Sequence, residues 1–231
     1  ALPIYFLNLT VKTDKPVVMT GAMRPSTATS ADGPMNLYQS IALATNEQAK
    51  GKGVMVVFSD GIYGGRDVQK ISTCQTDAFD SKDFGGMGYM VDGVPYFYND
   101  SVKCHTTETE FDVSSLKELP KVGVAYFTID ADPEILDYYK ESGVQGIVIA
   151  GAGSGCYSEQ WNNKIDELAE TGIPVVRCSR IGSGVITQDD YFIGNIARGN
   201  DLAPQKAATL LRLILTVTND IEQVQNMFDK Y

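Results

Sequence analysis

The sequence is poor in histidine, and this scarcity excludes several kinds of active site. Among 231 residues there is one histidine, His105. A zinc site built from several histidines therefore cannot form, and a Ser-His or Cys-His nucleophile pair would have to use this one residue. Because a lone histidine is more often structural than catalytic, and because His105 lies in a polar segment, we expect it at the surface.

Long apolar runs and basic clusters are also lacking. No stretch approaches the roughly 18 apolar residues that a transmembrane helix needs, so we expect no membrane span. The chain has 19 Lys and Arg against 29 Asp and Glu, which gives a formal net charge of −10. Without a basic stripe to offset that charge, we expect no binding to nucleic acid or to an anionic membrane surface.

Cysteine is sparse, and common active-site motifs are missing. The four cysteines have no C-x-x-C spacing and are too few for a disulfide scaffold, so we expect buried or free thiols. Neither a Walker A sequence nor a G-x-S-x-G elbow occurs. The first residues, 1–7, are already apolar, with no methionine and no signal-peptide pattern. We therefore expect that the chain begins partway through a domain.

Short apolar strands alternate with helical patterns along most of the chain, which is typical of an α/β fold. In the first half, the patterns predict a buried strand over 16–21, a helix from Pro34 with Leu37, Ile41 and Ala44 at helical spacing, a strand over 54–58 and a hairpin turn at Asp92-Gly93. In the second half, they predict strands over 122–127, 146–150 and 174–178, and helices near 133–142, 158–171, 204–217 and 220–230.

One segment interrupts this alternation. Residues 99–120 are polar, with acids, Ser and Thr and few apolar anchors, and are typical of a linker. We therefore expect two α/β domains. Residues 1–98 should form a mostly parallel sheet with flanking helices, and residues 121–231 a smaller α/β domain.

The glycine-rich segment 151–156 follows a predicted strand and precedes a predicted helix, as a dinucleotide-binding loop would. The G-x-G-x-x-G fingerprint needs its third glycine where Cys156 stands, and no acidic residue closes a second strand at the required distance. A tight turn is therefore favoured over a dinucleotide site. Such turns still line ligand crevices in open α/β sheets.

Two further segments are candidates for chemistry. The segment 21–34 leaves the first predicted strand at its carboxyl end, the usual ligand edge of such a sheet. Its Arg24 and Asp32 could staple a long connection as an ion pair, or support a ligand site. Lys70, which closes Gly-Gly-Arg-Asp-Val-Gln-Lys at 64–70, is typical of a surface lysine by its spacing. With histidine so scarce, a hydroxyl nucleophile activated by lysine is the kind of nucleophilic catalysis that remains available.

These segments resemble a known family. Lys-Pro-Val-Val-Met-Thr-Gly-Ala-Met-Arg-Pro-Ser-Thr at 15–27, followed by Ser-Ala-Asp-Gly-Pro-Met-Asn-Leu-Tyr at 30–38, closely resembles bacterial-type L-asparaginases, particularly type II. Further stretches fit in the same order, at 64–70, 111–114, 119–122 and 200–207. The match is collinear from about Tyr5 to Tyr231.

The resemblance implies hydrolysis of L-asparagine to L-aspartate and ammonia, often with weaker activity on L-glutamine. It also implies two α/β domains, a homotetramer built from intimate dimers, and no metal or organic cofactor. In the family, a threonine near the start of the chain attacks the side-chain amide carbon, while a second threonine, an aspartate and a lysine handle the protons. Likeness to type II favours a periplasmic or secreted location and leaves the cytoplasm open.

Part of the family's site can be carried over to this sequence. Lys70 matches the family's lysine, whose charge would lower the pKa of a neighbouring hydroxyl or orient water. Ala22 matches the residue whose backbone carbonyl meets the substrate amide, with Met23 beside it. Arg24 and Asp32 fit a supporting role.

The sequence also departs from the family's pattern. The T-G-G-T segment with the nucleophilic threonine has no counterpart, and the lid tyrosine, the Ser-Gln pair and the H-G-T-D-T motif would lie before Ala1. Cys156 stands where a partner subunit normally contributes Asn or Ser. Asp189 and Asp190 are the candidates to replace the partner's glutamate, which meets the substrate's α-amino group.

We therefore expect an asparaginase without its N-terminal portion, as a fragment or a decayed copy, and no activity from these 231 residues alone. The rival from another class is a non-catalytic binding or assembly remnant. A glutaminase-asparaginase is the alternative specificity.

Overall fold

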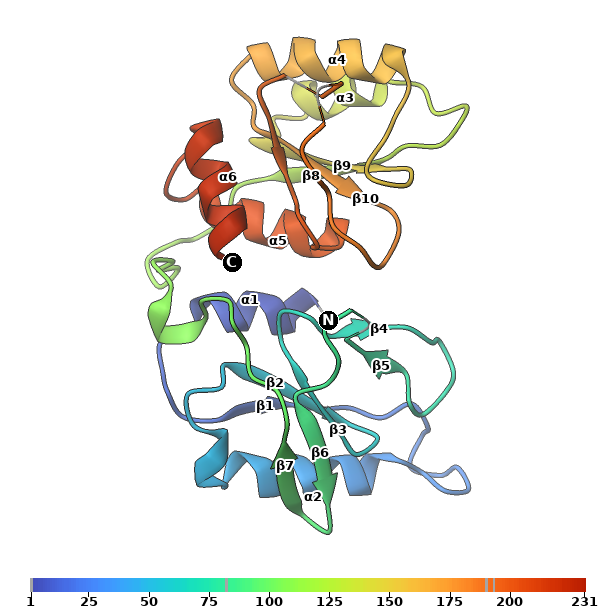
Figure 1. Cartoon of the computed structure of the whole chain (residues 1–231), viewed down its shortest axis with the longest axis vertical. Coiled ribbons are helices and arrows are strands. Elements are labelled where there is room, and N and C mark those ends of the chain that lie inside the picture. The colour runs from blue at the N-terminus through green and yellow to red at the C-terminus, as the bar shows by residue number, and fades with distance from the viewer. Residues whose placement is uncertain (1, 82, 190, 193) are drawn as a thin grey trace. The chain divides into compact units, whose positions relative to one another are not determined.

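The computed structural model describes residues 2–81, 83–189, 191–192 and 194–231, and the chain divides into two compact units. The first is Ala1–Glu110 and the second is Phe111–Tyr231. Both contain a sheet with helices against it, which confirms the predicted pair of α/β units (Figure 1). The division falls inside the segment 99–120, whose role as a linker stays a prediction.

The first unit is built on a five-stranded sheet in the order β1-β2-β3-β6-β7. These strands are β1 Val17–Met19, β2 Val54–Phe58, β3 Gly61–Gly64, β6 Gly88–Val91 and β7 Val94–Phe97, and a separate ladder joins β4 Gln69–Lys70 to β5 Phe79–Asp80. Helices α1 Leu2–Thr10 and α2 Gly33–Ala44 lie on opposite faces of the sheet (Figure 1), with short 3-10 turns at Glu47–Ala49 and Thr106–Glu108.

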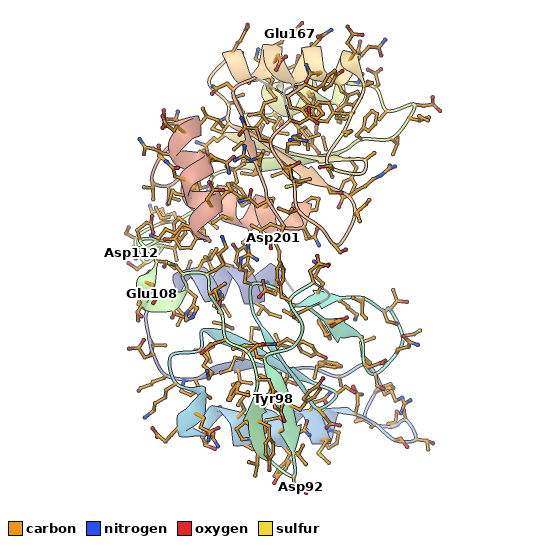
Figure 2. All side chains as sticks on the ribbon, viewed as in Figure 1. Asp92, Tyr98, Glu108, Asp112, Glu167 and Asp201 are labelled. Carbon is orange, nitrogen blue, oxygen red and sulfur yellow. The ribbon has the colours of Figure 1, made fainter. Side chains whose placement is uncertain are left out.

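This sheet is mixed, whereas the sequence pattern favours a mostly parallel one. β1 and β2 are parallel, and the pairs β2–β3, β3–β6 and β6–β7 are antiparallel. The reversal comes from Ser59 and Asp60, whose φ angles of 49° and 66° make the left-handed turn that favours a tight hairpin. The other hairpin turn, Asp92-Gly93, is confirmed with φ angles of 50° and 78°, and Figure 2 shows Asp92 at its tip.

Burial in the first unit differs from the sequence pattern in two places. β1 is half-buried along its length, because it has a strand neighbour, β2, on only one side in the described sheet. Helix α2 begins near the predicted position, but Leu37, Ile41 and Ala44 are exposed. Its buried face holds Asn36, Gln39, Ser40 and Leu43. Two of these polar residues hold loops: Asn36 contacts Gly21 and Ser59, and Gln39 donates to Asp60 at 2.6 Å.

His105 is buried rather than at the surface, with 8% of its area exposed. Its Nδ1 lies 3.0 Å from Oγ1 of Thr106, in a turn where Thr109 Oγ1 donates to the carbonyl of Leu9 at 2.6 Å. Lys12 Nζ also donates to the carbonyl of Thr109 at 2.6 Å. Hydrogen bonds thus hold this polar segment against α1, which is why its lack of apolar residues misled the prediction.

The second unit has an all-parallel sheet in the order β11-β10-β9-β8. Its strands are β8 Val122–Tyr126, β9 Gly146–Gly151, β10 Val175–Ser179 and β11 Ile196–Arg198. Helices α3 Ile135–Glu141 and α4 Glu159–Glu170 cover one face, and α5 Pro204–Ile214 and α6 Ile221–Lys230 lie on the other (Figure 1). The predicted strands and helices are confirmed, and β11 is an additional strand.

The core of this unit explains why its elements are easy to predict. β9 is buried at every position, as expected of a central parallel strand covered on both faces. α4 buries Trp161, Ile165, Leu168 and Ala169 at helical spacing against Ile147 and Ile149. Local pattern and tertiary burial therefore agree here.

Candidate active site

The connection that leaves β1 is held by Asp32. One carboxylate oxygen of Asp32 accepts the backbone N–H of Met23 at 2.9 Å, and the other accepts that of Arg24 at 2.9 Å. The hydrogen bond from Met23 is the main cause that lowers the pKa of Asp32. The guanidinium of Arg24 donates to the carbonyl of Ser30 at 2.8 Å. Asp32 and Arg24 therefore do not pair with each other. The carboxylate of Asp32 accepts two backbone N–H groups, and the guanidinium of Arg24 donates to a backbone carbonyl, so both side chains hold the backbone of the loop.

Asn36 is a second fastener, which the sequence reasoning missed. It is buried, its Nδ2 donates to the carbonyl of Gly21 at 3.0 Å, and its Oδ1 accepts the backbone N–H of Ser59 at 3.1 Å. Nδ2 also lies 3.2 Å from Asp32 Oδ2. One helical side chain thus ties the ends of β1 and β2 together. Nothing in composition or spacing marked it, because a buried polar residue is recognised by its partners, and these lie elsewhere in the chain.

A hydrophobic cluster brings Met23 and Lys70 to the same part of the first unit. Met23 and Phe79 both pack against the cluster that contains Phe58. The rings of Phe58 and Phe79 are 4.7 Å apart, and Lys70 Nζ lies 5.8 Å from the centroid of Phe79. Lys70 is exposed, as its spacing predicts, and so is Ala22 at the carboxyl end of β1. Both can therefore meet a molecule from solvent.

The glycines before Lys70 join its strand to the centre of the sheet. The N–H of Gly65 donates to the carbonyl of Val54 at 2.7 Å, and a Cβ at Gly65 would lie 2.8 Å from that oxygen, too close for any other residue to fit without a shift. Next to it, Nη1 of the buried Arg66 pairs with Asp67 at 2.9 Å. This turn sets where β4, and with it Lys70, lies relative to β2.

In the second unit, the segment 151–156 is the tight turn that the sequence favours. Ala152 and Cys156 exchange two backbone hydrogen bonds of 2.8 and 2.7 Å, and Gly153 and Gly155 have φ angles of 53° and 80°. Helix α4 begins only at Glu159, capped by Ser158. Cys156 is exposed, and all four cysteines are free thiols. The turn therefore exposes Cys156 to solvent on a backbone that two hydrogen bonds hold in place.

Asp189 is exposed in the segment before β11. Its carboxylate accepts the N–H of Tyr191 at 2.9 Å, and its carbonyl accepts that of Phe192 at 3.0 Å. It lines a cavity of about 220 Å³ together with Arg177, Gln188, Phe192, Gly194, Ile196 and Arg198. Asp190 lies outside the described residues. Lys70, Ala22 and Met23 thus belong to the first unit, and Cys156 and Asp189 to the second.

The described residues offer neither a metal site nor a membrane span. No group of three or more His, Cys, Asp or Glu side chains is placed to hold a metal ion among those residues. None of their helices is long and apolar enough to cross a membrane.

Both halves of the chain match family models. Residues 4–103 match "Asparaginase, N-terminal", and residues 121–228 match "Glutaminase/Asparaginase C-terminal domain". L-asparaginase 2 of Bacillus subtilis is 45% identical over 98% of this chain and 60% of that protein. Glutaminase-asparaginase of Acinetobacter glutaminasificans is 43% identical over 98% of this chain and 70% of that protein.

A solved structure has the same fold as this chain. The crystal structure of a probable cytoplasmic L-asparaginase from Campylobacter jejuni is 46% identical, with a TM-score of 0.95 over 100% of this chain and 76% of that one. The chain therefore spans between 60% and 76% of the length of these three relatives. With this identity along nearly all its residues and the same fold, the chain belongs to the asparaginase family of hydrolases.

Proposed function

We propose that this protein, in the form that its native source produces, hydrolyses the side-chain amide of L-asparagine. Water is consumed, the amide C–N bond breaks, and L-aspartate and ammonia are released. The observation that carries the proposal is the fastened loop after β1, which presents Ala22 and packs Met23 on the same cluster as Phe79, beneath Lys70. Relatives named L-asparaginase support the choice of amide.

Each residue has a defined role in this proposal. The backbone carbonyl of Ala22 accepts a hydrogen bond from the substrate's amide, and Met23 lines the site beside it. The ammonium group of Lys70 lowers the pKa of the attacking hydroxyl or orients the water. Asp32 and Arg24 hold the loop that presents Ala22. The attacking threonine of the family is not among the 231 residues, so we expect these residues alone to be inactive, because loss of a nucleophile costs several orders of magnitude in rate.

The first experiment is the intact mass of the protein from its native source. A mass clearly above 25.1 kDa would identify a longer form, and we expect that form to release ammonia from L-asparagine. An amidase rate above background from the purified 231-residue chain would contradict its predicted inactivity. A native form of either mass that releases no ammonia from L-asparagine would overturn the hydrolase proposal.

A non-catalytic binding remnant is the second candidate. It predicts saturable heat when L-asparagine is titrated calorimetrically into the 231-residue chain, with no product formed. The absence of heat from the chain, together with ammonia release by a longer form, would exclude it.

Glutaminase activity is the alternative specificity, favoured by the 43% identity to a relative named glutaminase-asparaginase and by Cys156 in the place of the family's Asn or Ser. The ratio of kcat/KM for L-asparagine and L-glutamine decides it. Cys156→Asn is the matched variant, because it restores the family's residue on a turn whose backbone is fixed. An unchanged ratio would exclude Cys156 as a determinant.

We further propose that the active form is a homotetramer. The supporting feature is an apolar surface on α2 and the β6–β7 hairpin, where the exposed side chains of Met35, Tyr38, Tyr89 and Val91 line one hollow of about 580 Å³. Contiguous apolar surface of this kind marks protein contacts. Native mass spectrometry should give four chains, and Tyr89→Lys should lower the oligomer order. A monomeric wild type would overturn this proposal.

A further inference from the structure

A buried arginine joins two exposed segments of the second unit. Arg177 lies on β10 and has 2% of its area exposed, whereas Ser154 and Thr187, in the segments on either side, are exposed. Nη1 of Arg177 donates to the carbonyl of Ser154 at 2.8 Å, and Nη2 donates to the carbonyl of Thr187 at 2.7 Å. One guanidinium thus holds the turn 151–156 and the segment that leads to Asp189.

Packing fixes the guanidinium in place. Cζ of Arg177 lies 4.1 Å from the centroid of the Phe192 ring. On the other side, a Cβ added to Gly155 would lie only 3.1 Å from Cγ of Arg177. The planar fork of arginine suits two acceptors on different sides, whereas the ammonium of lysine is a point donor on a flexible stem. A buried charge persists only when hydrogen bonds satisfy it, and here two backbone carbonyls do so.

We propose that Arg177 is a positioning residue that sets the joint geometry of Cys156 and Asp189. The proposal rests on the proposed function in so far as these two residues face the substrate of a partner subunit. Cys156 is two residues beyond Ser154, and Asp189 is two residues beyond Thr187. A shift of the guanidinium would therefore move both segments at once. No local hydrogen bond within either segment could couple them in this way.

Hydrogen exchange tests the coupling without reference to activity. Suitable reporters are the N–H of Cys156, bonded to Ala152, and the N–H of Phe192, bonded to Asp189. In Arg177→Met we expect both to exchange about tenfold faster, because both carbonyl contacts lose a charged donor. Arg177→Lys should restore protection to one segment and not to both.

Two neighbouring side chains provide matched controls. Ser179 Oγ donates to the carbonyl of Gly153 at 2.6 Å, so Ser179→Ala should affect the Cys156 reporter alone. The side chain of Arg180 donates to the carbonyl of Phe127 at 3.1 Å, and its backbone N–H, which a substitution keeps, donates to the carbonyl of Gly151 at 2.9 Å. Arg180→Met should therefore leave both reporters unchanged. The fluorescence of Trp161, the only tryptophan, confirms that each variant is folded. Unchanged exchange at both reporters in folded Arg177→Met and Arg177→Lys would overturn the coupling.

Kinetics then tests the positioning role in the native form of the enzyme. We expect Arg177→Lys to raise KM for L-asparagine about tenfold, with kcat within about twofold, because the segments contact the substrate and not the attacking group. Faster exchange with an unchanged KM would overturn the positioning role. If the wild type has no amidase activity, the proposed function fails, while the exchange result still decides whether Arg177 couples the segments.

Discussion

The two units differ in the side chain that makes most of the contacts to the loop at the carboxyl edge of the sheet: a carboxylate in the first, where Arg24 adds one bond to Ser30, and a guanidinium in the second. In the first unit, the carboxylate of Asp32 and the amide of Asn36 collect backbone N–H groups. In the second, the guanidinium of Arg177 collects backbone carbonyls. The comparison teaches that a loop at the carboxyl edge of a sheet is held by whichever side chain matches the main-chain group that the loop turns inward.

The difference also separates the expected roles of the two units. The first presents Lys70, a charge that can act on protons, near a fixed backbone. The second presents Cys156 and Asp189, which we assign to substrate contact in a partner subunit. Substitutions in the first unit should therefore change the rate of chemistry, and those in the second should change substrate binding.

The largest expected effect is that of Lys70→Met. In the native form of the enzyme, we expect kcat to fall by about 10²–10⁴, the usual contribution of a group that handles protons. Because Lys70 is exposed, the thermal midpoint should stay unchanged. Lys117→Met, at another exposed lysine, is the control. Equal activity of the two variants would break the division of roles between the units.

Asn36→Ala should have the largest effect on stability. The side chain is buried and holds Gly21, Ser59 and Asp32, so its loss removes three hydrogen bonds at once from the loops that follow β1 and β2. We expect the free energy of unfolding to fall by about 1–3 kcal/mol, measured by urea titration with circular dichroism. Ser40→Ala is the control, because Ser40 Oγ bonds only within α2 in the described contacts and should matter much less. Similar losses in both variants would mean that Asn36 does not fasten the loops.

Asp32→Asn tests the carboxylate fastener through pH. Backbone hydrogen bonds, led by that of Met23, lower the pKa of Asp32 in the folded state. Its contribution to stability is therefore complete above the unfolded pKa of about 4, and it disappears as the pH falls through the lower folded pKa. We expect the variant to be less stable than the wild type at pH 7 and equal to it in strong acid. Urea titrations between pH 7 and pH 2 measure this, and a difference that does not depend on pH would contradict it.

Asp166→Asn is the matched substitution in the second unit and should have the smallest effect. Burial raises the pKa of Asp166, so its favourable contribution is complete below the unfolded pKa and is lost as the pH rises through the folded pKa. The Nδ2 of Asn162 donates to Oδ2 of Asp166 at 3.2 Å. At pH 7 we expect the variant to be at least as stable as the wild type. A loss of stability at pH 7 like that of Asp32→Asn would remove the contrast between the units.

Local pattern predicts most of the second unit well, because its central strand and α4 bury the residues that their periods indicate. In α4, the inward residues Trp161 and Ile165 follow helical spacing. In α2, the pattern indicates Leu37 and Ile41, yet these are exposed, at 56% and 57% of their areas. Hydrophobic spacing finds the helix but cannot find its inward face when polar side chains are used to hold loops.

The candidate site shows the same limit. Lys70, Ala22 and Met23 came from the resemblance, and their roles stay predictions. Asn36 and Arg177 carried no signal in composition or spacing, because a buried polar residue is recognised by its partners. Those partners, Gly21 and Thr187, are distant from them in the chain by 15 and 10 residues.

The sequence by itself determined the family, most of the α/β elements in their order and the turn chemistry at Asp92-Gly93, since these depend on local period and on short motifs. It did not indicate α1, β11 or the β4–β5 ladder. The tertiary structure decided which face of α2 is buried, that His105 is inside, and that β2 turns back into β3. It also decided how Asp32 and Arg177 are used. The physical reason is that buried backbone groups must find partners, and the partner is chosen by what the folded chain brings within hydrogen-bond distance.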